Sequence, residues 1–319
     1  MIFADDIHDS VRPLAKSYEK LKGWKLRDAI IIYHFSVGSD VSEFVKSLPN
    51  KKILIYHNIT PAHFLSGYDD FVKEILEQGR GELKLFVDVC DLALGDSEFN
   101  RLELEEMGFK KTGVLPIILN FDKYDNTSDP RIINRFNDGY KNIIFVGRVV
   151  PNKCQEDIIL AFYLYKTYIN PKSRLFLIGM QGIERYDFML EELIEHLQLD
   201  DDVHLTGLVT DEELAAYYKI ADLLLCMSEH EGFNVPMLEA MHANIPILAY
   251  NATSIPYTLD GAGVLVNKKN YEEIAEMMDF LMENQPLRSR ILETQRKRLI
   301  FFEKPQLEGL LKSYIEQVC

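Results

Sequence analysis

The sequence is poor in cysteine, and its cysteines are far apart. Its 319 residues contain four, Cys90, Cys154, Cys226 and Cys319, with no Cys-x-x-Cys pair and no histidine at ligand spacing. A small disulfide scaffold or a structural zinc site needs several cysteines in a regular spacing, so both classes are excluded. We expect reduced thiols, two of them in the core, in a cytoplasmic protein that binds no metal.

The chain also lacks an excess of cationic charge and any long apolar run. Lys and Arg total 35 against 50 Asp and Glu, a formal net charge of −15, which excludes nucleic acid as an expected partner. No apolar run approaches the ~20 residues that a membrane span needs. No signal-peptide pattern precedes the first polar segment, so we expect a cytoplasmic protein without a transmembrane segment. A hydrophobic content of 47% also excludes a disordered chain.

The second half of the chain alternates between short apolar runs and stretches with helical spacing. From Lys141 onward, the apolar runs are Ile143–Val146, Leu175–Ile178, Val203–Leu205, Leu223–Cys226, Ile245–Ala249 and Val264–Val266. Two of the intervening helix starts carry capping boxes, Thr210 with Glu213 and Asn270 with Glu273. Continuously apolar strands separated by helices predict a parallel sheet that is covered on both faces. This half is therefore a doubly wound α/β domain.

The first half repeats the same alternation. Its predicted strands are Ile2–Ala4, Ala29–Tyr33, Lys52–Tyr56, Leu92–Gly95 and Val114–Pro116. A polar stretch rich in Asp and Asn, with Pro130 inside it, predicts a linker. The predicted organisation is an amino-terminal domain over 1–120, a linker over 121–140, a second domain over 141–304 and a C-terminal helix over 305–319. We consider that this helix crosses back to the first domain.

Two cations follow the first strand of the second domain. Gly147-Arg148 comes directly after this strand, and Lys153 lies just before the next helix. Gly147 permits close backbone approach, and open α/β sheets bind ligands at the carboxyl ends of their strands. Arg148 and Lys153, near the positive end of a helix, therefore predict a diphosphate site. Two solvated surface cations are the alternative that this local pattern leaves open. No P-loop signature is present.

The most informative motif is the segment from Ser228 to Ala240. Glu231 and Glu239 bracket a predicted helix start, with Pro236 in the first turn, where its missing N–H costs nothing. The intervening loop presents backbone N–H groups to an anionic or hydroxyl-rich ligand. Because carboxylates accept hydrogen bonds from vicinal hydroxyls, one acid is suited to a sugar and the other to a ribose. In the alternative interpretation, Glu239 lies on a solvated helix face, and Glu231 is an N-terminal carboxylate that interacts favourably with the helix dipole.

These motifs together resemble the retaining family 4 glycosyltransferases of GT-B fold. The resemblance rests on Glu231-x7-Glu239 with Gly232-Phe233 and Pro236 between, preceded by residues 145–148 and Lys153. It runs from about Ile2 to the end and is most specific over 142–266. It implies two Rossmann-like, doubly wound domains that face a cleft. Family members begin with a strand, a Gly-rich loop and a helix before the segment that matches 2–6, so we expect the amino-terminal domain to lack its first βα unit.

The resemblance implies roles for the matched residues. Arg148 and Lys153 would bind the donor diphosphate, Glu231 the transferred sugar and Glu239 the ribose. The implied donor-binding set is Gly147, Arg148, Lys153, Gly207, Leu208, Val209, Glu231, Gly232, Phe233, Asn234, Val235 and Glu239. Within it, 207–209 match the segment that grips the base, and the backbone of 232–234 contacts sugar and phosphate. Asn234 replaces the small residue usual in the family, but Asn tolerates left-handed backbone.

A histidine completes the implied catalytic set of His57, Glu231, Arg148 and Lys153. His57 follows a predicted strand and resembles the family's acceptor-side histidine, which would donate a hydrogen bond to a sugar hydroxyl or to the developing charge. A structural histidine is the alternative reading from the residues alone. His34, in a similar position after Tyr33, is a weaker candidate, and His230 is a candidate for a supporting role inside the acidic motif.

The resemblance implies a retaining, metal-independent hexosyltransferase without a cofactor. The donor would be a GDP- or UDP-linked sugar, with GDP-mannose as the first choice, and the acceptor a glycan or a lipid-linked saccharide. Two alternatives stay open: a nucleotide-sugar epimerase of the same architecture, which the spacing of the two acids disfavours, and a non-catalytic nucleotide-sugar-binding or partner subunit. Transient membrane contact and a homo-oligomer formed through an unfilled sheet edge also stay open.

Overall fold

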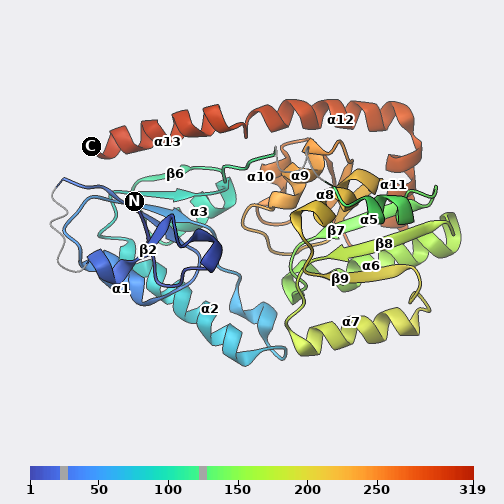
Figure 1. Cartoon of the computed structure of the whole chain (residues 1–319), viewed down its shortest axis with the longest axis horizontal. Coiled ribbons are helices and arrows are strands. Elements are labelled where there is room, and N and C mark those ends of the chain that lie inside the picture. Colours follow the sequence, from blue (N-terminus) through green and yellow to red (C-terminus); the bar gives the residue numbers. More distant parts are fainter. Residues whose placement is uncertain (22–27, 122–127) are drawn as a thin grey trace. The chain divides into compact units, whose positions relative to one another are not determined.

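The computed structural model describes residues 1–21, 28–121 and 128–319, which form two compact units (Figure 1). Unit 1 consists of Met1–His63, Asp70–Pro116 and Gly309–Cys319, and unit 2 of Phe64–Asp69 and Ile117–Glu308. Both units are built on parallel sheets with helical crossovers, which confirms the predicted α/β class. None of the described helices is long and apolar enough to cross a membrane.

Unit 2 contains a six-stranded parallel sheet. Its strands are β7 (Lys141–Val146), β8 (Ser173–Ile178), β9 (Val203–Gly207), β10 (Leu223–Cys226), β11 (Ile247–Tyr250) and β12 (Val264–Val266). They are arranged in the order β12-β11-β10-β7-β8-β9. The direction of winding reverses between β7 and β10, and the carboxyl ends of these two strands are the topological switch point where such sheets bind ligands. The predicted doubly wound sheet is confirmed in this unit.

Helices connect and cover these strands. They are α5 (Pro130–Phe136), α6 (Gln155–Leu164), α7 (Glu184–His196), α8 (Asp211–Ile220), α9 (Val235–His242), α10 (Ile255–Leu259), α11 (Tyr271–Glu283) and α12 (Gln285–Ile300). A 3-10 turn over Pro151–Lys153 precedes α6, and a π-helical turn over Tyr165–Ile169 follows it. Helix α6 packs against α7 and α11, and α9 packs against α12. At α8 the predicted capping box is present, because Thr210 Oγ1 accepts from Glu213 N at 3.2 Å and Glu213 Oε2 accepts from Thr210 N at 2.9 Å.

The predicted linker over 121–140 includes residues 122–127, which lie outside the described residues, and it misses helix α5. Pro130 occupies its first turn, and the Asp129 carboxylate accepts a hydrogen bond from Arg131 N at 2.7 Å, which caps the helix. Helix α5 packs against α8 within unit 2. Residues 130–136 are therefore part of the folded unit, although the stretch around them is rich in Asp and Asn.

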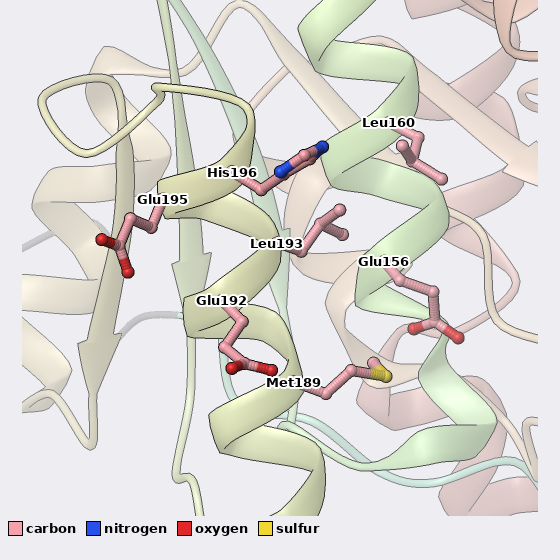
Figure 2. Close-up of a pocket in the computed structure, with 7 residues that line it drawn as sticks. All are labelled: Glu156, Leu160, Met189, Glu192, Leu193, Glu195 and His196. Atoms are coloured by element: carbon pink, nitrogen blue, oxygen red, sulfur yellow. The ribbon is translucent and has the colours of Figure 1, made fainter.

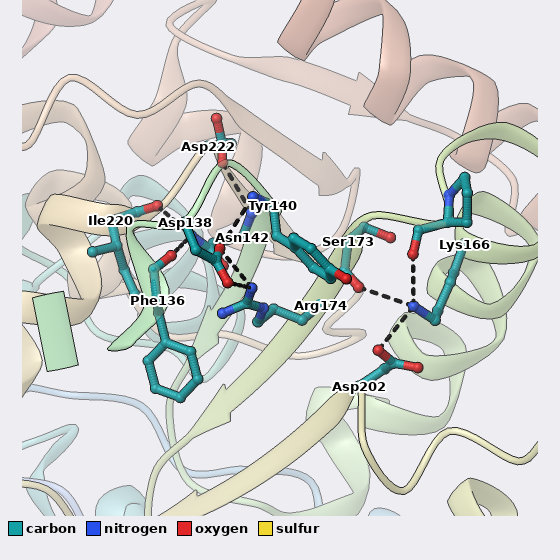
Figure 3. Close-up of polar contacts among 11 residues, drawn as sticks. Phe136, Asp138, Tyr140, Asn142, Lys166, Ser173, Arg174, Asp202, Ile220 and Asp222 are labelled. Carbon is teal, nitrogen blue, oxygen red and sulfur yellow. Dashed lines mark hydrogen bonds and ion pairs between the residues drawn. The ribbon is translucent and has the colours of Figure 1, made fainter. Parts of the chain in front are cut away.

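A polar network secures the amino ends of the central strands (Figure 3). The Asn142 side chain in β7 donates to the carbonyl oxygens of Phe136 and Ile220 at 3.2 and 3.0 Å. In β8, Arg174 binds both carboxylate oxygens of Asp138, at 2.7 and 2.6 Å, and its guanidinium lies 4.5 Å from the ring centre of Tyr140. These contacts tie β7 and β8 to the loops below them, at the end of the sheet opposite the switch point.

Unit 1 contains a four-stranded parallel sheet in the order β3-β4-β5-β6. The strands are β3 (Ile31–Phe35), β4 (Lys52–Tyr56), β5 (Leu92–Gly95) and β6 (Thr112–Val114), and the helices are α1 (Asp40–Ser47), α2 (Asp70–Leu83) and α3 (Glu98–Glu106). The predicted strands Ala29–Tyr33 and Val114–Pro116 were each offset by two residues from β3 and β6. Among the described residues, the reversal of a doubly wound sheet is present in unit 2 and absent from unit 1, whose strands follow chain order.

Two terminal segments complete unit 1. The predicted strand Ile2–Ala4 forms β1, but it pairs with β2 (Ala15–Ser17) in a separate small sheet rather than with β3. Helix α13 (Lys304–Val318) brings its last turns to unit 1, where the Tyr314 hydroxyl accepts from Val114 N at 3.2 Å. Of the four cysteines, Cys154 and Cys226 are buried and all are free thiols, as expected.

Candidate functional site

Two loops meet at the switch point of unit 2. One runs from Gly147 at the end of β7 to α6, and the other runs from the end of β10 to α9. The buried Asn152 joins them, because its side-chain amide donates to His230 O at 2.9 Å and its own carbonyl accepts from Glu229 N at 3.0 Å. The loops that contain the predicted cations and the predicted acids are therefore held against each other.

The predicted Lys153 and Glu231 form an ion pair between these loops. Lys153 Nζ lies 2.5 Å from Glu231 Oε2, and only 19% of the Lys153 side chain and 9% of the Glu231 side chain are exposed. An ion pair with so little exposure is screened less by water than a surface pair. The solvated-cation alternative is thus wrong for Lys153, whereas Arg148 is exposed, with its carbonyl held by Gln155 Nε2 at 3.0 Å.

The start of α9 has the backbone conformation that the motif predicts. Asn234 adopts a left-handed conformation with φ of 69°, immediately before the helix, and Pro236 stands in its first turn. The Phe233 carbonyl accepts from Thr258 Oγ1 at 2.6 Å, and the Glu231 N–H donates to Thr253 Oγ1 at 2.9 Å. These hydroxyls fix the turn that directs the N-terminus of α9 toward the carboxyl end of the sheet.

The second acid, Glu239, is buried in α9. It is 8% exposed, and the Tyr218 hydroxyl donates to its Oε2 at 2.7 Å. The alternative of a solvated helix carboxylate is therefore wrong. Tyr218, from α8, was not a predicted site residue, although its phenol holds the carboxylate in one orientation.

Three glycines form the ends of neighbouring strands. Gly147 and Gly179, after β7 and β8, both have φ of 152°, and a Cβ on Gly179 would lie 2.0 Å from the carbonyl oxygen of Gly147. Gly207, at the end of β9, accepts from Gly179 N at 3.2 Å. The adjoining Leu208 is 81% exposed, and Val209 follows it. Only glycine permits this backbone contact at Gly179.

A lysine that the sequence analysis missed joins the same two loops. Lys269 Nζ lies 2.5 Å from Asp157 Oδ2 in α6 and 2.8 Å from Glu229 Oε1 in the β10–α9 loop. Burial opposes the charged form, but the hydrogen bonds to Asp157 and Glu229 prevail and raise the pKa of Lys269. Cys154 lies beside these acids, and the three donor atoms of this cluster are within 4.8 Å of one another. Because the Lys269 ammonium already occupies the space between the two carboxylates and binds both, the cluster is not suited to a metal ion.

The His230 ring and a groove on unit 2 are not part of the Lys153–Glu231 pair or of the Lys269 cluster. The buried His230 ring packs against Phe64, with 6.0 Å between ring centres. The groove lies between α6 and α7, has a volume of about 830 Å³, and is lined by Glu156, Leu160, Met189, Glu192, Leu193, Glu195 and His196 (Figure 2). It contains none of the predicted donor-binding residues.

The predicted His57 lies in unit 1. Its Nδ1 is 3.3 Å from Asp96 Oδ2, and its Nε2 is 2.8 Å from His34 Nδ1. Burial raises the pKa of the Asp96 carboxyl, and hydrogen bonds from His57 and Asn100 offset part of that rise. Asp96 was not predicted, although it directly follows the predicted strand Leu92–Gly95.

Comparison with known families identifies the class of this chain. The family model "Glycosyl transferases group 1" matches residues 127–298, which is more than half of the sequence. The chain therefore belongs to this glycosyltransferase family. The match covers nearly all of unit 2, including both loops at the switch point.

Individual relatives are similar over part of their length. O-antigen chain mannosyltransferase B of Escherichia coli is 29% identical over 132 residues, which are 41% of this chain and 34% of that protein. The alpha-monoglucosyldiacylglycerol synthase of Acholeplasma laidlawii is 30% identical over 164 residues, 51% of this chain and 39% of that protein. The aligned part thus spans well under half of each curated relative.

Solved structures show the same fold. Sucrose-phosphate synthase from Thermosynechococcus elongatus has a TM-score of 0.71 at 17% identity, and the match covers 90% of this chain and 73% of that one. HepE of Anabaena, solved with UDP and glucose, has a TM-score of 0.67 at 17% identity, with 84% and 72% covered. Together with the trehalose-phosphate synthases that also match, these structures place the chain in the GT-B glycosyltransferase fold.

Proposed function

We propose that this chain is a retaining, metal-independent hexosyltransferase of family 4 that uses a nucleoside diphosphate sugar. The observation that supports the proposal best is the Lys153–Glu231 pair at the switch point, 2.5 Å apart and largely buried, beside the N-terminus of α9. A cation and an acid that are paired and largely buried at a strand end are suited to a ligand that bears both an anion and hydroxyl groups. A sugar attached to a diphosphate has both.

Donor binding would rearrange this pair. The diphosphate oxygens compete with Glu231 for the Lys153 ammonium, while the exposed Arg148 and the N–H groups at the start of α9 supply further positive potential. Glu231 is then released to accept hydrogen bonds from the hydroxyls of the sugar. The backbone of 232–235 would contact the sugar and the phosphates.

The remainder of the donor would follow the strand ends. Glu239, oriented by Tyr218, offers carboxylate oxygens to the vicinal hydroxyls of a ribose. Gly207, Leu208 and Val209, at the end of β9, would contact the base. These assignments place the nucleotide across the carboxyl ends of the sheet, as is usual for doubly wound folds.

In the proposed reaction, the leaving diphosphate takes the electron pair of the glycosidic bond. Lys153, Arg148 and the N-terminus of α9 stabilise its charge, and the acceptor hydroxyl attacks from the same face. Positioning and electrostatic stabilisation supply the acceleration, and the removal of one charge stabiliser costs about 100-fold or more in rate. In unit 1, His57 is the residue for which the resemblance implies a role on the acceptor side.

We propose mannose as the transferred sugar and a glycan or lipid-linked saccharide as the acceptor. Relatives named as mannosyltransferases support mannose, one relative is named as an alpha-monoglucosyldiacylglycerol synthase, and the HepE structure is named with UDP. GDP-mannose and UDP-glucose are therefore the first two donors to compare. We further propose that the protein acts in the cytoplasm, on the basis of its four free thiols.

A donor screen tests the proposal. Each nucleotide sugar is added to the purified chain, and the melting temperature and the reaction products are measured. A true donor raises the melting temperature by mass action and yields a transferred or hydrolysed sugar whose anomeric configuration is retained. Binding without turnover, or an inverted product, contradicts the proposed retaining transferase.

A further inference from the structure

Three polar groups lie side by side at the carboxyl edge of the unit 1 sheet. His34 is in β3, His57 directly follows β4, and Asp96 directly follows β5. Because β3, β4 and β5 are parallel neighbours, their carboxyl ends meet at one edge. Only His57 has an implied role in the glycosyltransferase resemblance.

The three groups form a continuous chain of hydrogen bonds from the interior to the surface. Asp96 is 1% exposed, His57 is partly buried and His34 is exposed. Asp96 Oδ2 lies 3.3 Å from His57 Nδ1, and His57 Nε2 lies 2.8 Å from His34 Nδ1. The two ring planes differ by only 9°. Since parallel rings in face-to-face contact could not bring two nitrogens so close, the rings meet edge to edge.

A second series of side chains fixes the direction of these bonds. The Glu103 carboxylate can only accept, so Asn58 must donate to it through Nδ2, at 3.2 Å. The same amide nitrogen donates to Asn100 Oδ1 at 2.7 Å, and Asn100 Nδ2 in turn donates to Asp96 Oδ1. The orientation of both amides is thereby determined, and the second oxygen of Asp96 is left to accept from His57.

The tautomers of both histidines follow from this direction. His57 carries its hydrogen on Nδ1 in order to donate to Asp96, so its Nε2 bears a lone pair. The hydrogen between the rings must then belong to His34 Nδ1. In the neutral ring this leaves a lone pair on His34 Nε2, at the exposed end of the chain of bonds.

We propose that Asp96, His57 and His34 form a proton relay in which His34 Nε2 takes the proton of the acceptor hydroxyl. The proposal rests on the transferase function above, since transfer to a hydroxyl must release that proton. As the oxygen forms its bond to the sugar, its O–H bond breaks and the proton moves to His34 Nε2. The hydrogen on His34 Nδ1 moves to His57 Nε2, and the positive charge comes to lie on His57, beside the Asp96 carboxylate.

The environment of the His34 ring agrees with its proposed role as proton acceptor. Loss of solvation around the inner side of the ring, followed by the charge of the neighbouring His57, lowers the pKa of His34 and favours the neutral ring. A purely structural histidine at a strand end would need no buried carboxylate, no second histidine and no oriented amides behind it. His34 and His57 are catalytic residues in this proposal, and Asp96 and Asn100 are positioning residues.

The first test measures the tautomers directly by nitrogen NMR of the full chain labelled in its 8 histidines. We expect hydrogen on Nδ1 and none on Nε2 for His34 and His57. In Asp96→Asn, the donation from Asn100 holds the new amide oxygen, so the amide nitrogen turns toward His57 and both tautomers reverse. Hydrogen on His34 Nε2 in the unmodified protein overturns the relay.

The second test measures transfer and donor binding together. His34→Gln, whose amide can still donate to His57, should reduce the transfer rate about 100-fold or more, the range for general base catalysis. Donor affinity should stay unchanged. His196→Gln, an exposed histidine on α7, is the matched control and should transfer normally. Normal transfer by His34→Gln overturns the relay.

The two hypotheses fail in different ways. If the unmodified chain neither binds nor turns over any donor, the proposed function is wrong and the relay loses its substrate, whereas the NMR result still decides whether the hydrogen bonds run from His34 through His57 to Asp96. If donor binding persists in His34→Gln and Asp96→Asn while transfer is lost, both stand. Circular dichroism and melting temperature show whether Asp96→Asn is folded, and the exposed His34→Gln provides the test if it is not.

Discussion

The two units present different chemistry at equivalent edges of parallel sheets. In unit 2, the strand ends hold the Lys153–Glu231 pair, the exposed Arg148 and a helix N-terminus, an arrangement suited to an anion. In unit 1, the strand ends hold His34, His57 and Asp96, an arrangement suited to moving a proton. A transfer reaction needs both, because a diphosphate leaves with negative charge while a hydroxyl gives up hydrogen. In the two proposals above, unit 2 stabilises the leaving diphosphate and unit 1 takes up the proton.

The largest effect should come from removing the cation of unit 2. Lys153→Ala is expected to reduce glycosyl transfer about 100-fold or more, because the leaving diphosphate loses a charge partner. The histidine tautomers of unit 1 should not change. Lys166→Ala is the matched control, since Lys166 is also largely buried and pairs with Asp202 at 2.8 Å, at the opposite end of the sheet (Figure 3). A Lys153→Ala variant with normal turnover contradicts the account of unit 2.

A backbone substitution should separate loop geometry from charge. Gly179→Ala would place a methyl group 2.0 Å from the Gly147 carbonyl oxygen, at a φ of 152° that side chains rarely adopt. We expect a loss of stability of several kcal/mol and a displaced β7 loop, measured by chemical denaturation and donor titration. Gly182→Ala, with open space around its position, is the control and should melt normally. Equal stability of the two variants would show that this contact is not required.

Removing Lys269 should weaken both loops at once. Lys269→Met leaves Asp157 and Glu229 without their shared cation, and the like charges then repel. We expect a melting temperature several degrees lower, because a charge-assisted hydrogen bond contributes about 1.5–3 kcal/mol. Donor binding should weaken about tenfold or more, because both loops lose their shared support. Calorimetry of melting and of donor binding measures both. Unchanged donor affinity in Lys269→Met would show that Lys269 does not support donor binding.

The smallest effect should follow from Tyr218→Phe. The substitution removes the hydrogen bond to Glu239 and keeps the ring, at a cost of about 1–2 kcal/mol. If Glu239 binds the ribose, KM for the donor should rise about tenfold while kcat changes little. Steady-state kinetics over a range of donor concentrations provides the test. A fall in kcat with constant KM would argue against a binding role for Glu239.

Local patterns were sufficient to predict the fold of unit 2. Its strands are continuously apolar, so the predicted bounds of β7, β8 and β10 agree with the structure to within two residues. The cap at Thr210 could be predicted because a capping box needs only a side-chain hydroxyl and a Glu three residues later. In unit 1, two strand boundaries differ from the prediction, and the segment Ile2–Ala4 belongs to a different sheet. A short apolar segment does not by itself determine which strand it pairs with.

The sequence indicated candidate site residues only where they form short local motifs. The motif from Glu231 to Glu239 is contiguous, and Arg148 and Lys153 follow one strand. Lys269 reaches the same loops from more than 35 residues away from Glu229, and nothing in its local sequence indicates an ion pair. Asp96 did have a signal, since a polar residue directly after a predicted strand is a candidate for the same edge.

The most direct test of the donor site is titration of GDP and UDP into the unmodified chain and into Lys153→Ala by calorimetry. The account predicts that one nucleoside diphosphate binds the unmodified chain, and that Lys153→Ala binds it at least about tenfold more weakly, as expected for a lost charge-assisted contact. Equal affinity of the two proteins, or no binding of either diphosphate, would contradict it.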